Sequence, residues 1–395
     1  MHFNVLTIMG VTVIIAVIGH MIFDKTGIPE SIFMIVLGLI LGPISDLVKL
    51  TEIQGIIPYV FTLSIVIILL ESGLSTDIQE AIETMRTSTI FTIIVLVTTS
   101  LLCGAFLNLV LGWSIAPSLI LGIICSGTST LPILYFTSRM KLSPVVNQML
   151  IFESIINDVT IITAVSIILQ FLTLKLTPSS VIMSIIQYII VAIFYGVIFS
   201  SIWTIVLVRI QDDLALKYLT TLAIATLLHA VAESRGGSGV VAVMFFSVTI
   251  GNLPKFFRTR LRIRRDVLRF FTGIEVMQDE VTFLVKNTFF FILGLMFNLE
   301  AVNGSILFIA LTLTGLMIVS RWASYRIIGF YDKRYVDNVM IVSLMVSRGL
   351  TAGLTAFMPM EQGLQFPHIT DIVIVMILFT NIAASIGFIA RTRKK

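Results

Sequence analysis

The stretch Glu153-Ser154-Ile155-Ile156-Asn157-Asp158 lies inside an apolar segment that runs from Met149 to Leu172. That segment is long enough to cross a bilayer as a helix. A charged residue at the centre of a membrane helix costs roughly 2.5–3.5 kcal/mol on insertion scales, so carboxylates at that depth usually mark an ion or proton pathway. The alternative is a structural ion pair that only joins helices. The two acids favour an ion pathway.

The rest of the chain is equally apolar. Of its 395 residues 57% are hydrophobic and 12% are charged, and the mean hydropathy is +1.05. This composition predicts a polytopic all-α membrane protein. We expect about thirteen spans, at residues 4–23, 29–48, 56–74, 88–111, 115–137, 145–173, 180–208, 214–233, 238–253, 280–298, 304–328, 336–358 and 370–390.

The placement of the basic residues sets the orientation. With thirteen spans and the C-terminus inside, most of the 26 Lys and Arg residues fall on the inner side, and only Lys49, Lys175 and Arg235 fall on the outer side. Cytoplasmic loops of membrane proteins carry an excess of Lys and Arg, so the inner side corresponds to the cytoplasm. We therefore expect a multi-pass protein of the cell membrane with its N-terminus outside and its C-terminus in the cytoplasm.

Two spans are interrupted in the same way. Span 5 contains Cys125-Ser126-Gly127-Thr128-Ser129-Thr130-Leu131-Pro132, and span 12 contains Ser347-Arg348-Gly349-Leu350-Thr351-Ala352-Gly353. Gly, Pro and hydroxyl residues in mid-span loosen a helix, although they also permit close helix packing. Paired interruptions at corresponding positions of two halves indicate a transporter built from inverted repeats, with two discontinuous helices crossing near the midplane.

The chain contains no linker, so residues 1–395 are expected to form a single membrane domain. The first repeat would cover about 4–173, the connector helix about 180–208 and the second repeat about 214–390.

Helical geometry separates the acidic run into two faces. Ser154 and Asp158 share one face, and Glu153 and Asn157 share another. A carboxylate with a hydroxyl one turn away offers hard oxygen ligands for a cation. Because burial also disfavours the charged form of a carboxylate, a proton and a cation can compete for the same oxygens.

The remaining charges within spans can be paired. The acids are Glu71, Glu153 and Asp158, and the arginines well inside spans are Arg321 and Arg348. An unpaired buried guanidinium is strongly unfavourable. We pair Glu153 with Arg321 and Glu71 with Arg348, which leaves Asp158 without a permanent counter-ion.

A basic segment, Lys255 to Arg269, lies between two spans. It predicts an amphipathic inner-surface helix that contacts anionic headgroups, and its position argues against a nucleic-acid partner. Lys286, about two turns into span 10, is expected to snorkel to the interface.

These residues carry a family resemblance. The Glu153–Asp158 run, the Gly127-Thr128-Ser129 break, the segment Phe289–Leu295, Arg321 and Ser347-Arg348-Gly349 resemble the prokaryotic sodium/proton antiporters of the monovalent cation/proton antiporter superfamily over about residues 5–390. The resemblance implies a homodimer in which a core bundle, spans 4–6 and 11–13, moves like an elevator against a scaffold formed by the other spans.

The resemblance also implies roles for individual residues. Asp158 would be the shared cation and proton ligand, with Thr128 and Ser154 completing the site of the transported metal ion. The Asn157-Asp158 pair is similar to the pair found in the branch of the family that is regarded as electroneutral. The resemblance also implies that Arg321 holds Glu153. Related proteins often carry a carboxylate where Ser129 stands. This departure leaves K⁺ or Li⁺ open beside Na⁺.

We therefore expect an antiporter that exchanges a monovalent cation for H⁺ and needs no cofactor. The alternative is a sodium-coupled symporter of an organic anion, although the pairing above leaves no spare cationic residue for such an anion. An intramembrane protease would need HExxH or a paired-aspartate signature, and the sequence contains neither. We do not expect an enzyme.

Overall fold

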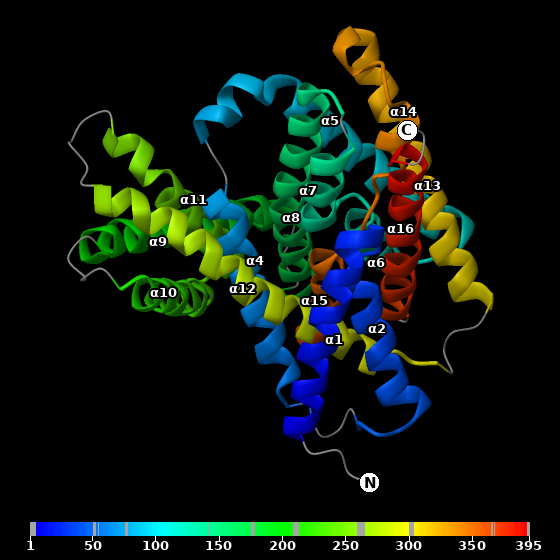
Figure 1. The fold of residues 1–395 in the computed structure, drawn as a ribbon, viewed down its shortest axis with the longest axis horizontal. Helices are drawn as coiled ribbons and strands as arrows, with labels where there is room; N and C mark the ends of the chain where they lie inside the picture. Colours follow the sequence, from blue (N-terminus) through cyan, green and yellow to red (C-terminus); the bar gives the residue numbers. More distant parts are fainter. Residues whose placement is uncertain are drawn as a thin grey trace. The chain divides into compact units, whose positions relative to one another are not determined.

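The computed structural model describes residues 5–49, 53, 55–75, 78–140, 142–174, 178–207, 213–258, 265–299, 304–364, 366 and 368–392. All regular secondary structure in these ranges is helical. The first half of the chain comprises α1 (Val5–Thr26), α2 (Glu30–Leu39) with a π-helical end (Ile40–Ile44), α4 (Ile57–Ser75), α5 (Ile78–Ala105) with a π-helical end (Phe106–Val110), α6 (Ile115–Ile124), α7 (Thr130–Arg139), α8 (Pro144–Leu174) and α9 (Pro178–Leu207) (Figure 1).

The second half follows the same pattern of long and interrupted helices. It comprises α10 (Leu214–Ser234), α11 (Gly239–Arg258), α12 (Arg265–Leu295), α13 (Gly304–Tyr331), a short 3₁₀ helix (Lys333–Tyr335), α14 (Val339–Leu344), α15 (Leu350–Glu361) and α16 (Ile369–Thr392).

The expected spans each correspond to one helix or to one interrupted pair. Among the described residues, seven helices are long and apolar enough to cross a membrane by length and composition, namely α4, α5, α8, α9, α10, α13 and α16. Three further apolar stretches are shorter, at Glu30–Ile44, Ile115–Ile124 and Gly239–Asn252. The helix that contains span 10, α12, begins at Arg265 and so includes part of the basic segment that we had expected to form a separate surface helix.

The two interruptions predicted from the sequence are present. Residues 125–129 separate α6 from α7, and residues 345–349 separate α14 from α15. Pro132 is tolerated because it lies in the first turn of α7, where a backbone N–H has no partner within the helix. The all-α fold with two discontinuous helices is therefore confirmed.

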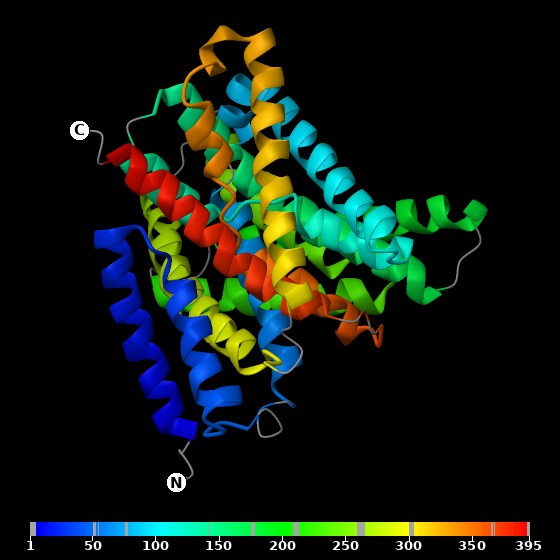
Figure 2. The same ribbon diagram turned by 90° about the vertical axis from the view of Figure 1, so that its right-hand side faces the viewer.

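The chain forms two compact units. One comprises residues 1–58, 84–165 and 286–395, and the other comprises 59–83 and 166–285. In the first unit, α1 and α2 lie side by side, and α13 packs against α14 and α16 (Figure 2). In the second unit, α9 packs against α10 and α11. Both interruptions and the acidic run of α8 belong to the first unit.

An aromatic cluster within the first unit holds several of these helices together. Phe91 of α5 packs edge-on against Tyr325 of α13 with ring centroids 6.1 Å apart. Phe136 of α7 packs against Phe388 of α16 at 5.1 Å. All four rings are buried, so large apolar surfaces fix α7 beside α16 and α5 beside α13.

Candidate functional site

The two interruptions touch one another. The backbone N–H of Ser129 donates to the carbonyl of Ser347 at 2.8 Å, and the Arg348 guanidinium donates to the carbonyl of Cys125. A side chain at position 349 would collide with Ser129, so glycine is required for this approach. These contacts satisfy backbone groups that the helix ends leave free.

Helix α16 holds the second interruption in place. The Asn381 side-chain amide donates to the carbonyl of Arg348 at 2.9 Å, and Ser347 donates to the Asn381 side-chain oxygen. The backbone N–H of Arg348 donates to Thr380 at 3.2 Å. Irregular backbone inside a membrane protein needs such partners, because no water is available there to replace them.

Asp158 of α8 lies where the second halves of the two broken helices begin. Thr130, the first residue of α7, donates to Asp158 Oδ2 at 2.9 Å. Thr351, at the start of α15, donates to Asp158 Oδ1 at 2.6 Å. The side chain is buried, and no ion pair to it exists among the described residues. Hydroxyl groups and two helix N-termini, which favour a negative charge, hold this carboxylate.

The other residues expected to bind the cation are mostly buried. Thr128, Ser154 and Asn157 are buried, and Ser129 is half-buried. The Ser154 hydroxyl donates to the carbonyl of Ile151 at 2.8 Å, so its lone pairs point elsewhere. Thr128 Oγ1 and Asn157 Oδ1 have no hydrogen-bond partner among the described residues. Unused buried oxygens are costly unless they serve a bound ion or water.

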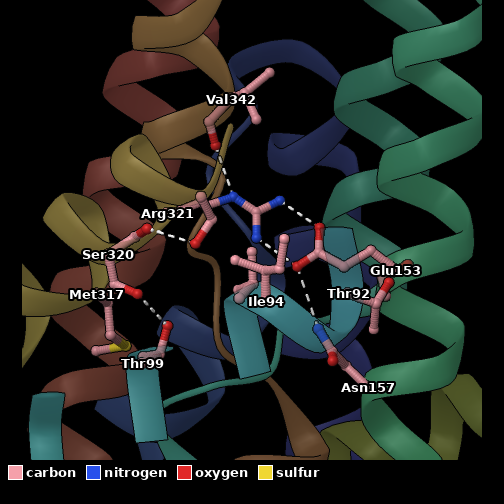
Figure 3. Close-up of polar contacts among 12 residues, drawn as sticks. Thr92, Ile94, Thr99, Glu153, Asn157, Met317, Ser320, Arg321 and Val342 are labelled. Carbon is pink, nitrogen blue, oxygen red and sulfur yellow. Dashed lines mark hydrogen bonds and ion pairs between the residues drawn. The ribbon is translucent and has the colours of Figure 1, made fainter. Parts of the chain in front are cut away.

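Glu153 and Arg321 form a buried ion pair. Arg321 Nη1 and Nη2 each lie 2.5 Å from a Glu153 oxygen, and Arg321 Nε donates to the carbonyl of Val342 at 2.7 Å (Figure 3). The Asn157 amide donates to Glu153 at 3.2 Å. The Arg321 guanidinium also lies 5.5 Å from the Phe91 ring centroid. Because both charges receive further partners, their burial is tolerable.

Hydroxyl groups extend this network from α13 to α5. The Ser320 hydroxyl lies 2.8 Å from that of Thr99 and 2.9 Å from that of Thr98 (Figure 3). Thr98 also lies 3.1 Å from Ser324. The Arg321 side chain is therefore fixed at its base as well as at its tip.

Arg348 contacts neutral groups. Its guanidinium bonds the Cys125 carbonyl and lies 3.0 Å from the Met317 sulfur. The expected pairing with Glu71 joins residues of different units, and it stays a prediction.

The expectation that Lys286 snorkels is wrong. Lys286 is buried and forms an ion pair with Glu30 at the start of α2. Glu30 stands at the start of the span expected at residues 29–48, and it was not among the acids that we placed within spans. The side chains of Lys255 to Arg269 lie outside the described part of the structure.

Sequence reasoning missed four polar residues of this site: Thr130, Thr351, Thr380 and Asn381. Thr130 and Thr351 both stand in the interrupted segments, and their position at the start of a half-helix was the available signal. Asn381 in mid-span was a second signal, because a side-chain amide at that depth needs partners.

Together these groups can hold one exchangeable charge. The Asp158 carboxylate can bind a proton or a hard cation, and the hydroxyl and amide oxygens around it can complete a cation's coordination. The charge of Glu153 is neutralised by Arg321, so this carboxylate is not available to bind a cation in the same way.

Comparisons with known proteins identify the family and the fold. Residues 11–392 match the family described as sodium/hydrogen exchanger, transmembrane. The structure of the sodium proton antiporter MjNhaP1 from Methanocaldococcus jannaschii at pH 8 is similar, with a TM-score of 0.78 and 21% identity over 98% of this chain and 96% of that chain. A second MjNhaP1 structure, from an electron-microscopy map, gives a TM-score of 0.70 and 20% identity over 99% and 96%.

The structural likeness establishes the fold, and the family match spans nearly the whole chain. It favours cation/proton antiport over symport of an organic anion. The chain belongs to the sodium/hydrogen exchanger family of multi-pass membrane transporters and is a cation/proton antiporter.

Proposed function

We propose that the protein exchanges one monovalent cation for one proton at Asp158, without net charge movement. The observation that supports this proposal is a buried carboxylate with two hydroxyl donors and no ion-pair partner among the described residues. Na⁺ is the favoured cation because the family is named for it, and K⁺ and Li⁺ are the alternatives that the hydroxyl at Ser129 leaves open.

The cation ligands in this proposal come from two segments, α8 and the first interruption. Asp158 and Ser154 are supplied by α8, and Thr128 and Ser129 by the first interruption. Asn157 contributes through the side-chain oxygen that has no partner. Oxygen ligands of this kind suit hard cations.

The Glu153–Arg321 pair has a structural role in this proposal. Its charges stay fixed while Asp158 changes its occupant, so the proton-loaded and cation-loaded carriers carry the same charge. Glu71 and Arg348 are proposed as a second fixed pair.

Exchange would proceed by alternating access. By resemblance to the family, spans 4–6 and 11–13 form the moving core of a homodimer. The basic segment from Lys255 to Arg269 would contact anionic headgroups on the cytoplasmic side of the cell membrane, with the N-terminus outside and the C-terminus in the cytoplasm.

Proteoliposomes with an internal pH-sensitive dye test the proposal directly. An acid-loaded interior should become more alkaline when Na⁺ is added outside, and parallel additions of Li⁺ and K⁺ rank the cations. Asp46→Asn, a change in an exposed turn, is the matched control for Asp158→Asn. The absence of proton movement with all three cations would overturn the proposed function.

A further inference from the structure

The two cysteines of the chain lie together in the first unit. Cys103 stands near the end of α5, and Cys125 is the residue at which α6 ends and the first interruption begins. Both are free thiols and both are buried. Their side chains are hydrogen-bonded to each other. Two thiols from different helices therefore meet at one buried place.

Close packing of α5 against α6 explains this meeting. A side chain at Gly122 would lie 2.5 Å from the carbonyl oxygen of Ser100 and 3.0 Å from the backbone nitrogen of Gly104. Glycine allows two backbones to approach this closely. Cys103 adjoins Gly104 in the chain, and Cys125 follows Gly122 by less than one helical turn. The thiols are thus placed by the rigid packing of two helices.

A third sulfur atom comes from α16. The Cys125 thiol donates to the Met376 sulfur at a distance of 3.5 Å, and Met376 is also buried. Buried cysteine and methionine side chains commonly serve only to fill a core. Core filling requires apolar volume, however, and it does not require sulfur atoms from three helices to face one another.

The three sulfur atoms form a set of ligands for a soft metal ion. A metal–thiolate bond is about 2.3 Å long, so two sulfur ligands of one ion can lie up to about 4.6 Å apart. The distance of 3.5 Å between Cys125 and Met376 falls within this limit. Thiolate and thioether ligands select Cu⁺ among the biological metals, whereas carboxylates and carbonyls suit hard cations.

We propose that Cys103, Cys125 and Met376 bind one soft monovalent metal ion, of which Cu⁺ is the biological example and Ag⁺ is a further probe. Binding displaces a proton from one thiol. The charge of the ion and that of the thiolate then cancel, which makes the buried complex tolerable. The second thiol and the thioether act as neutral donors.

This site is separate from the one proposed for the transported cation. None of the three sulfur side chains belongs to the oxygen ligands proposed around Asp158, and the proposal does not depend on the exchange reaction. A metal ion bound here joins α5, the start of the first interruption and α16. Because a ligand that binds only the folded state stabilises it by mass action, Cu⁺ should raise the melting temperature of the purified protein.

Titration of the reduced, detergent-purified protein with the coloured Cu⁺–bicinchoninate complex, without oxygen, tests the site. The protein should remove about one Cu⁺ per chain from the dye, and Ag⁺ should compete whereas Na⁺, K⁺ and Li⁺ should not. Because one proton is displaced, affinity should fall by about tenfold for each unit that the pH is lowered. Failure of the wild-type protein to bind Cu⁺, or an affinity that does not change with pH, overturns the proposal.

Variants show whether the three sulfur atoms are the ligands. Cys103→Ser and Cys125→Ser should each weaken Cu⁺ binding by about a hundredfold or more, and Met376→Leu by about tenfold, equivalent to about 1.4 kcal/mol. Met140→Leu is the matched control, because Met140 is buried in a separate apolar cluster with Phe136, and it should leave the affinity unchanged.

If the serine variants do not fold, Met376→Leu still decides the question, because an exchange of methionine for leucine conserves core volume. Wild-type affinity for Cu⁺ in folded Cys125→Ser, or equal affinities in Met376→Leu and Met140→Leu, overturns the assignment.

Discussion

Glu153 and Asp158 lie five residues apart on α8, are both buried, and have opposite surroundings. Glu153 is held by both terminal nitrogens of Arg321 at 2.5 Å and by the Asn157 amide. Among the described residues, Asp158 is held only by the hydroxyl groups of Thr130 and Thr351. One carboxylate has a permanent counter-ion, and the other receives hydrogen bonds without a compensating full charge.

This difference separates stability from transport. A carboxylate neutralised by a fixed arginine has little reason to exchange its partner, whereas one held by hydroxyls can take a proton or a cation. Removing Glu153 should therefore damage the folded protein, and removing Asp158 should damage transport alone.

The largest expected effect is on transport by Asp158→Asn. The amide cannot carry the exchangeable charge, so cation-dependent proton movement should disappear while the protein still inserts and purifies as the wild type does. Asp158→Glu should keep partial activity with altered cation affinity, since its carboxylate is placed differently. Dye-loaded proteoliposomes measure both variants. Retained exchange in Asp158→Asn would show that another group carries the proton.

The next largest effect should be on stability at the paired acid. Glu153→Gln and Arg321→Gln each leave an uncompensated buried charge, which typically costs ~3–5 kcal/mol. Both should melt earlier in detergent, and the double variant should lose less than the sum of the two losses. Melting curves of the four proteins measure this coupling. Strictly additive losses would mean that the pair is energetically unimportant.

The same contrast predicts the charge balance and the pH dependence of transport. With Glu153 fixed by Arg321, only Asp158 changes its occupant, so exchange should produce no net current on a solid-supported membrane. Apparent cation affinity should weaken as the pH falls, because protons compete for the same oxygens. A cation-dependent current that is lost in Asp158→Asn would contradict one-for-one exchange.

Smaller effects are expected from the hydroxyl groups at Asp158. Thr351→Val removes one donor to the carboxylate, and a hydrogen bond to a charged group contributes about 1.5–3 kcal/mol. The charged form becomes less favourable, so the pH at which acid inhibits transport by half should rise by about one unit or more. Thr355→Val, one turn along α15, removes a buried hydroxyl whose bonds to described residues stay within its own helix, and it should leave the midpoint unchanged. Equal midpoints in the two variants would argue against the Thr351 contact.

The smallest effect should come from an exposed pair of the same chemistry. Asp332 and Arg334 contact each other at 2.5 Å in the loop after α13, but their side chains are 21% and 66% exposed. Hydrogen bonds from Arg334 lower the pKa of Asp332, so the pair's contribution is present above the unfolded-state pKa of Asp and is lost as the pH falls through the lowered value. Solvent screens exposed pairs, and Asp332→Asn should barely change the melting temperature at neutral pH. A loss as large as that of Glu153→Gln would contradict the importance of burial.

Much of the fold could be predicted from the sequence because the membrane imposes simple requirements. Apolar length marks most of the spans, and Gly, Pro and hydroxyl residues mark the interruptions between α6 and α7 and between α14 and α15. The Glu153–Arg321 pair could also be predicted, since a deeply buried guanidinium needs an acid and few were available.

Other parts of the site depend on contacts between distant segments. Thr130 and Thr351 are separated by more than two hundred residues, and no local pattern shows that both reach Asp158. The Glu30–Lys286 pair was missed for a similar reason. Glu30 stands at the edge of its span in the sequence, but packing between α2 and α12 buries it.

The sequence by itself determined the all-helical membrane fold and its two broken helices, and it singled out Asp158 as the acid that we propose to be exchangeable, because these follow from the cost of placing polar groups in hydrocarbon. Only the tertiary structure decided which groups surround that acid and that Lys286 pairs with Glu30. Those features depend on packing between segments far apart in the chain, and a periodic pattern along one segment carries no information about them.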